Sequence, residues 1–100
     1  MSGFTVRLRK KALADISQIR SWYGKIDPAQ EDRLVRSLNK GLDRIAAHPF
    51  AYQVVYRNTR RVLLDKFPYS VYYLIQDANV LVLAVIHHKR NPELARGRAE

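Results

Sequence analysis

The sequence predicts an α+β domain in which an antiparallel helical hairpin lies across one mostly antiparallel sheet. Three observations predict this class. Apolar and polar residues alternate at the start, the next forty residues carry apolar side chains at helical spacing, and the residues after Pro49 return to strand-like patterns. With 100 residues the chain can bury one compact core. We therefore expect a single domain over residues 1–100, in the order β-α-α-β-β-β-β.

The first strand and the first helix are predicted from a change of period. Alternation over residues 4–10 (FTVRLRK) is typical of a half-buried strand. From Lys10 the spacing becomes helical, and the apolar positions are Ala12, Ile16, Ile19 and Tyr23. Gly24 and the following Ile-Asp-Pro predict the end of this helix.

The second helix has clear signals at both ends. Asp27 is suited to cap the first free N–H groups, and Pro28 suits the first helical position. His48-Pro49 predicts the end, because the residue before a proline is driven out of the helical region. Between them runs an apolar stripe of Leu34, Val35, Leu38, Leu42 and Ile45.

Four further strands are predicted, over residues 54–58, 60–67, 70–76 and 79–88. The last is apolar on both faces, so we expect it in the interior of the sheet. On strict alternation His87 shares a face with Leu83 and Val85, whereas His88 shares a face with Ile86. The two histidines should therefore point to opposite faces.

The charge is strongly and unevenly positive. The chain has 18 Lys and Arg against 9 Asp and Glu, a net charge of +9. Residues 1–25 carry six basic side chains and one acid, whereas residues 26–50 carry four of each. Such an excess favours a nucleic acid, a ribonucleoprotein or an acidic protein as partner. The alternative is that the charge contributes only solubility.

Several chemistries are disfavoured by the residues available. The chain has no cysteine, and its histidines lack the spacing of a metal site, so we expect neither disulfides nor a bound metal. No glycine-rich loop precedes a helix, so no nucleotide or other cofactor is expected. The start resembles no signal peptide and no stretch is of membrane-spanning length, from which we expect a cytoplasmic protein.

Phosphodiester cleavage is one chemistry that the basic residues could carry. It needs cations to hold phosphate and a group of near-neutral pKa to move protons. The candidates are Arg60, Arg61, Lys66, His87 and His88. The alternative is that the arginines are solvated at a strand start and the histidines are structural. Three tyrosines near predicted loops could contact bases by stacking, namely Tyr52, Tyr56 and Tyr69.

The chain resembles the RelE/ParE superfamily of toxins from bacterial type II toxin–antitoxin modules over nearly its whole length. The resemblance is carried by Ala14-Asp15-Ile16 in the first helix, by the His-Pro that closes the second, by RRVLLDKFPYSVYYLI and by VLVLAVIHHKRNPELARGR. It implies a ParD-like or RelB-like antitoxin that neutralises the toxin in a hetero-oligomer, and contact with operator DNA only through that complex. It also implies growth arrest and a role in plasmid stabilization.

Two branches of the superfamily differ in their target. RelE-like members are ribosome-dependent mRNA endonucleases with a stacking aromatic residue near the C-terminus, and ParE-like members inhibit DNA gyrase. No aromatic residue follows Tyr73, and the ending His-His-Lys-Arg-Asn-Pro resembles the ParE side, so we favour gyrase inhibition without enzymatic activity. The endonuclease stays the alternative, and a module that only binds an antitoxin is a third. The residues expected to contact the target or the antitoxin are Trp22, Arg61, His87, Lys89 and Arg90.

Overall fold

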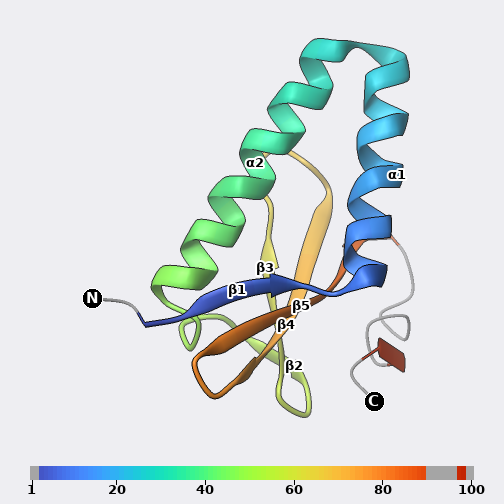
Figure 1. Cartoon of the computed structure of the whole chain (residues 1–100). Helices are drawn as coiled ribbons and strands as arrows, with labels where there is room; N and C mark the ends of the chain where they lie inside the picture. Colours follow the sequence, from blue (N-terminus) through green and yellow to red (C-terminus); the bar gives the residue numbers. More distant parts are fainter. Residues whose placement is uncertain (1–2, 90–96, 99–100) are drawn as a thin grey trace.

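The structure, a computed structural model, describes residues 3–89 and 97–98. Two helices form an antiparallel hairpin that lies over one side of a five-stranded sheet (Figure 1). The elements are β1 (Thr5–Leu8), α1 (Lys10–Ile26), α2 (Pro28–Ala47), β2 (Val54–Tyr56), β3 (Thr59–Leu63), β4 (Tyr69–Gln76) and β5 (Asn79–His87). The predicted α+β class and element order are confirmed. Within the described residues, no helix is long and apolar enough to cross a membrane.

The strand order in the sheet is β1-β5-β4-β3-β2. Strand β5 therefore lies in the interior, as predicted from its apolar character on both faces. β1 pairs with β5 in parallel, with Val6 opposite Val80, while the other neighbours are antiparallel. The parallel pair joins the start of the domain to its last strand. Both helices lie between β1 and β2 in the chain, so β1 does not pair with the strand that follows it in sequence (Figure 1).

A bulge in β5 changes which side chains face the helices. Tyr72 pairs with Ala84 but Tyr73 pairs with Val82, so Leu83 is an extra residue on β5. One extra residue moves every later side chain of the strand to the opposite face.

The predicted grouping of His87 with Leu83 is therefore wrong. Val80, Val82 and Val85 belong to the core under the helices, whereas Leu83 belongs to a second apolar cluster on the opposite face of the sheet. His87 follows Val85 at the two-residue spacing of a strand and lies on the helix side, where it lines a groove beside α1.

The first helix ends at Ile26, within the Ile-Asp-Pro predicted to end it, and it continues through Gly24, which was the other predicted end signal. Gly24 lies where the two helices approach closely, since a Cβ on this residue would be 2.6 Å from Oε1 of Glu31. The same carboxylate accepts a 3.0 Å hydrogen bond from Nε of Arg20. This glycine therefore permits a contact between helices and does not terminate one. The predicted cap of the second helix is confirmed, because Oδ1 of Asp27 accepts the N–H of Ala29 at 3.0 Å.

The second helix buries three residues of its predicted apolar stripe, Leu34, Leu38 and Ile45, while Val35 and Leu42 are partly buried. It also buries two small residues that the pattern did not indicate. Oγ of Ser37 donates a 2.7 Å hydrogen bond to the carbonyl of Asp65. Gly41 faces the end of Leu64, whose Cδ2 would lie 2.9 Å from an added Cβ. These small side chains let α2 lie close to the chain that follows β3. That strand ends at Leu63 and not at the predicted residue 67.

Candidate functional site

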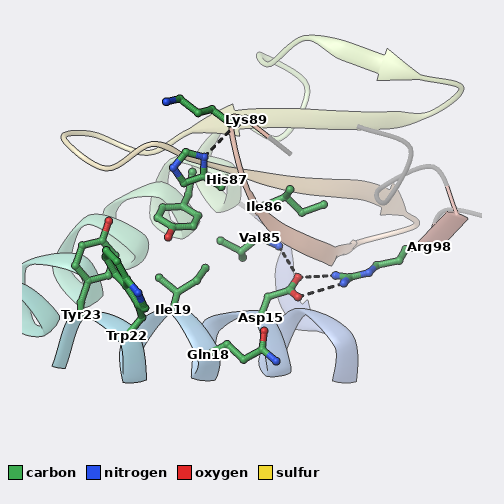
Figure 2. Close-up of a pocket in the computed structure, with 11 residues that line it drawn as sticks. Asp15, Gln18, Ile19, Trp22, Tyr23, Val85, Ile86, His87, Lys89 and Arg98 are labelled. Atoms are coloured by element: carbon green, nitrogen blue, oxygen red, sulfur yellow. Dashed lines mark hydrogen bonds and ion pairs between the residues drawn. The ribbon is translucent and has the colours of Figure 1, made fainter. Parts of the chain in front are cut away.

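A groove of about 560 Å³ lies between α1 and the end of β5 (Figure 2). The helix lines it with Asp15, Ile19 and Trp22, whose spacing of four and three residues places them on one flank. The remaining lining residues are Gln18, Tyr23, Tyr69, Val85, Ile86, His87, Lys89 and Arg98. The groove therefore combines apolar, aromatic and charged groups from segments far apart in the chain.

One end of the groove is a row of aromatic rings. Trp22 and Tyr23 meet edge to face at 4.9 Å, and Tyr69 lies 6.3 Å from Tyr23 and 5.1 Å from the ring of His87. Such edge-to-face pairs fix the orientation of the rings as well as burying them. Trp22 is 59% exposed, so this end presents a large apolar side chain to solvent.

The histidine ring is held by a short turn. The backbone N–H of Lys89 donates a 3.1 Å hydrogen bond to Nδ1 of His87. The proton of the neutral ring therefore lies on Nε2, which acts as a donor. His88 is exposed outside the groove, and its backbone N–H donates to the carbonyl of Pro68 at 2.8 Å.

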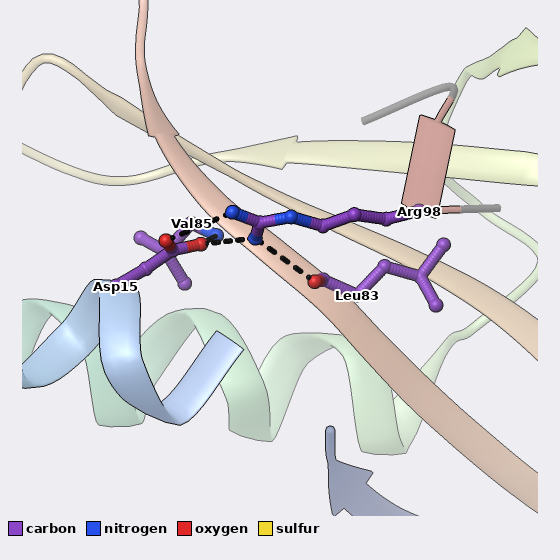
Figure 3. A network of polar contacts seen from close by, with 4 residues as sticks. All are labelled: Asp15, Leu83, Val85 and Arg98. Carbon is purple, nitrogen blue, oxygen red and sulfur yellow. Dashed lines mark hydrogen bonds and ion pairs between the residues drawn. The ribbon is translucent and has the colours of Figure 1, made fainter. Parts of the chain in front are cut away.

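The other end of the groove is closed by an ion pair (Figure 3). The carboxylate of Asp15 accepts hydrogen bonds from Nη1 and Nη2 of Arg98, at 2.5 and 3.1 Å, and from the N–H of Val85 at 3.0 Å. Nη1 of Arg98 also donates to the carbonyl of Leu83 at 3.2 Å. The pair thus forms hydrogen bonds with the N–H of Val85 and the carbonyl of Leu83, two backbone groups of β5 that lie beyond its pairing with β1.

The arginine pair of β3 lies elsewhere. Nη1 of Arg60 donates to the carbonyls of Phe50 and Tyr52, at 3.1 and 2.7 Å, so its guanidinium holds the loop before β2. The next residue, Arg61, points to the other face of the sheet, where Nη2 lies 3.5 Å from Oε1 of Gln53.

The charged residues that follow the arginine pair are also outside the groove. Lys66 is exposed in the turn after β3, with a φ of 68°. Of the five residues considered for phosphodiester cleavage, His87 alone lines the groove. Among the described residues, no group of three His, Cys, Asp or Glu could hold a metal ion.

Comparison with known proteins identifies the family. Residues 6–92 match the family described as ParE toxin of type II toxin-antitoxin system, parDE. The chain belongs to this ParE toxin family. No protein of curated function matches the sequence. The ParE chain is also similar to a solved structure, "Chromosomal ParDE TA system from P. aeruginosa", with a TM-score of 0.75 and 16% identity over 87% of this chain and 98% of that one. At that identity the likeness shows the fold alone.

The ParE groove brings together part of the expected binding set. Trp22, His87 and Lys89 line it, whereas Arg61 lies on the opposite face of the sheet and Arg90 lies outside the described residues. Sequence reasoning missed Gln18 and Tyr23 as lining residues and gave Asp15 and Arg98 only as part of the family resemblance. The helical spacing of Asp15, Ile19 and Trp22 was the one available signal for this flank of α1.

Proposed function

We propose that this ParE-family chain is a toxin that inhibits DNA gyrase and is neutralised by a ParD-type antitoxin. Membership of the family supports both parts of the proposal. The solved structure of similar fold is itself described as a ParDE toxin–antitoxin system. The net charge of +9 is compatible with the cytoplasmic target that we propose.

The observation that carries the proposal is the chemistry of the groove. The carboxylate of Asp15 is held by Arg98 and by the N–H of Val85, and Nδ1 of His87 accepts the N–H of Lys89, so neither Asp15 nor that ring nitrogen is free to accept a proton from a substrate. Arg60 and Arg61, which would hold a phosphate in a nuclease, lie apart from it. An exposed aromatic ring with flanking cations favours binding of a protein surface.

The test is DNA supercoiling by purified gyrase with the toxin titrated in, beside a ribosome-programmed mRNA cleavage assay. We expect supercoiling to be lost, or cleaved DNA to be trapped, while the mRNA stays intact. Cleavage of mRNA at ribosome-positioned codons with unaffected gyrase would overturn the proposal in favour of a RelE-like endonuclease. Absence of growth arrest on expression, with antitoxin binding retained, would indicate a module that only binds its antitoxin.

The adjacent histidines provide a matched pair of variants. His87→Ala removes a ring from the groove, and His88→Ala removes the neighbouring exposed ring outside it. We expect His87→Ala to weaken gyrase inhibition only in part, because it removes one contact among several. His88→Ala should have little effect. A complete loss of activity in His87→Ala with normal binding to gyrase would instead point to a catalytic role.

A further inference from the structure

The end of β1 and the start of α1 carry a run of positive charge that lies outside the groove. In the segment Arg-Leu-Arg-Lys-Lys, four of five residues are basic, and all four basic side chains are exposed. We call these four residues, Arg7, Arg9, Lys10 and Lys11, the basic strip. The apolar Leu8 in the middle of the segment packs against the core, so the strip is fixed to the fold.

The charge of the strip is not neutralised within the described residues. Nε of Arg7 donates to the amide oxygen of Asn79 at 3.1 Å, and Nη1 of Arg9 donates to the carbonyl of Arg98 at 3.4 Å. Both acceptors are uncharged, so they orient the guanidinium groups and leave the positive charge intact. Asp15 is the nearest acid along the chain, and its carboxylate is taken by Arg98 and Val85.

A pocket lies beside the strip. It has a volume of about 380 Å³, and its lining residues are Arg9, Lys10, Lys11, Leu83, Gly97 and Arg98. Arg98 lines this pocket and the groove, so the two hollows are neighbours along β5. A concave, water-accessible site with several cations raises the local concentration of an anion.

We propose that the basic strip binds the phosphodiester backbone of duplex DNA. Oriented arginines and exposed lysines suit phosphate oxygens, which dominate the affinity of sequence-independent DNA binding. An acidic protein is the less favoured partner, because a protein interface is organised around large buried apolar anchors. Beside the strip, Leu13 is the sole large apolar residue that is more than half exposed on the first two turns of α1, whereas Trp22 lies in the groove.

The proposal goes beyond gyrase inhibition, and its test uses DNA alone, so the two can fail separately. Binding of the full-length chain to a fluorescent duplex is measured by fluorescence anisotropy. The salt concentration is varied from about 50 to about 300 mM, because binding through phosphate contacts weakens strongly over this range. About four phosphate contacts give a slope of log K against log salt of about −3 to −4. In a variant combining Arg9→Ala, Lys10→Ala and Lys11→Ala, we expect affinity to fall more than about 10-fold and the slope to shrink by about 3.

The control removes the same charge from another exposed surface. It combines Arg33→Ala, Arg36→Ala and Lys40→Ala on α2, where all three side chains are exposed. An equal loss of affinity in both variants would overturn the proposal, because net charge and not the strip would then govern binding. Binding of a poly-glutamate peptide in place of the duplex would overturn it in favour of an acidic protein. Thermal unfolding of each variant shows whether it is folded. The double variant Lys10→Ala with Lys11→Ala leaves Arg9 in place and should still lose affinity for the duplex.

Discussion

Asp15 and Arg98 form a two-pronged ion pair although 83 positions separate them in the chain. The same carboxylate holds the N–H of Val85, and the same guanidinium holds the carbonyl of Leu83. Together the two side chains supply an acceptor and a donor to the edge of β5 that faces away from β4, beyond Val82, where the pairing with β1 ends and no other described strand pairs with it. They therefore fasten α1, β5 and the C-terminal end of the described chain to one another and protect an open strand edge.

We expect Asp15→Ala to lower the free energy of unfolding by about 2 kcal/mol, because it leaves a buried N–H and a largely buried guanidinium without their acceptor. Arg98→Ala should cost a similar amount, and the double variant less than the sum of the two. Urea unfolding measures all three. Asp43→Ala, at an exposed position on α2, is the control and should change stability by less than about 0.5 kcal/mol. Additive losses would show that the pair is not coupled.

Tyr73 gives the domain a pH-dependent contribution to stability. Its ring is fully buried, and its hydroxyl donates a 2.6 Å hydrogen bond to the carbonyl of Pro49. Burial raises the pKa of Tyr73 to about 12, against a smaller lowering by the charge of Arg60. The unfolded chain releases this proton near pH 10 and the folded chain near pH 12, so the contribution is complete below pH 10 and is lost as pH rises toward 12.

In Tyr73→Phe we expect about 1–2 kcal/mol less stability at pH 8, because the buried carbonyl loses its donor. Between pH 10 and 12 the parent protein should lose on the order of 2 kcal/mol that the variant keeps, since the variant has no such proton to lose, and the difference in stability should vanish or reverse. Guanidinium unfolding of both proteins across this pH range measures the difference in their free energies of unfolding. Other groups that titrate in this range contribute equally to both proteins, so their contributions cancel in the difference. A difference that stayed constant with pH would contradict the assignment to Tyr73.

Two buried hydroxyls should respond to removal in opposite directions. Oγ1 of Thr59 has no hydrogen-bond partner among the described residues, whereas Oγ of Ser37 donates to the carbonyl of Asp65 at 2.7 Å. We expect Thr59→Val to raise the free energy of unfolding by about 1 kcal/mol, because an unpaired buried hydroxyl is costly. Ser37→Ala should lower it by about 1 kcal/mol. Thermal unfolding compares them, and a destabilised Thr59→Val would mean that the hydroxyl is satisfied.

Trp22 should matter for binding far more than for folding. Its ring is 59% exposed, so Trp22→Ala should change stability by less than about 0.5 kcal/mol. If the groove is the partner surface proposed above, the same change should weaken binding to the antitoxin or to gyrase by about 10- to 100-fold, as truncation of an interface tryptophan does. Calorimetric titration measures it. Leu63→Ala, a half-exposed apolar residue on the opposite face, is the control, and equal effects would place the partner elsewhere.

Much of the fold followed from local patterns. Asp27-Pro28 began the second helix as predicted, and alternation located β1 with an error of one residue at its start and two at its end. The Ile-Asp-Pro marked the end of the first helix correctly, but the role given to Gly24 was wrong, because a glycine at a close approach of two helices looks in sequence like a glycine that ends one. The extent of β3 was misjudged for a similar reason, since its apolar pattern continues beyond Leu63 into a turn where Lys66 adopts a left-handed conformation.

Less of the groove than of the fold could be predicted from the sequence. Trp22, His87 and Lys89 were expected to contact a partner and do line the groove, but nothing in the sequence indicated that Asp15 pairs with Arg98. His87 was grouped correctly with Val85 but wrongly with Leu83, because Leu83 is an inserted residue that reverses the alternation beyond it.

What the sequence by itself determined is the set of elements, the apolar stripe of α2, the interior position of β5 and the family resemblance. These rest on periodicity, capping and charge, which act between residues a few positions apart. The tertiary structure alone decided the parallel pairing of β1 with β5, the bulge at Leu83 and the Asp15–Arg98 pair. Those features arise from contacts more than 70 positions apart, or from packing of one strand against another, and no local pattern of side chains specifies them.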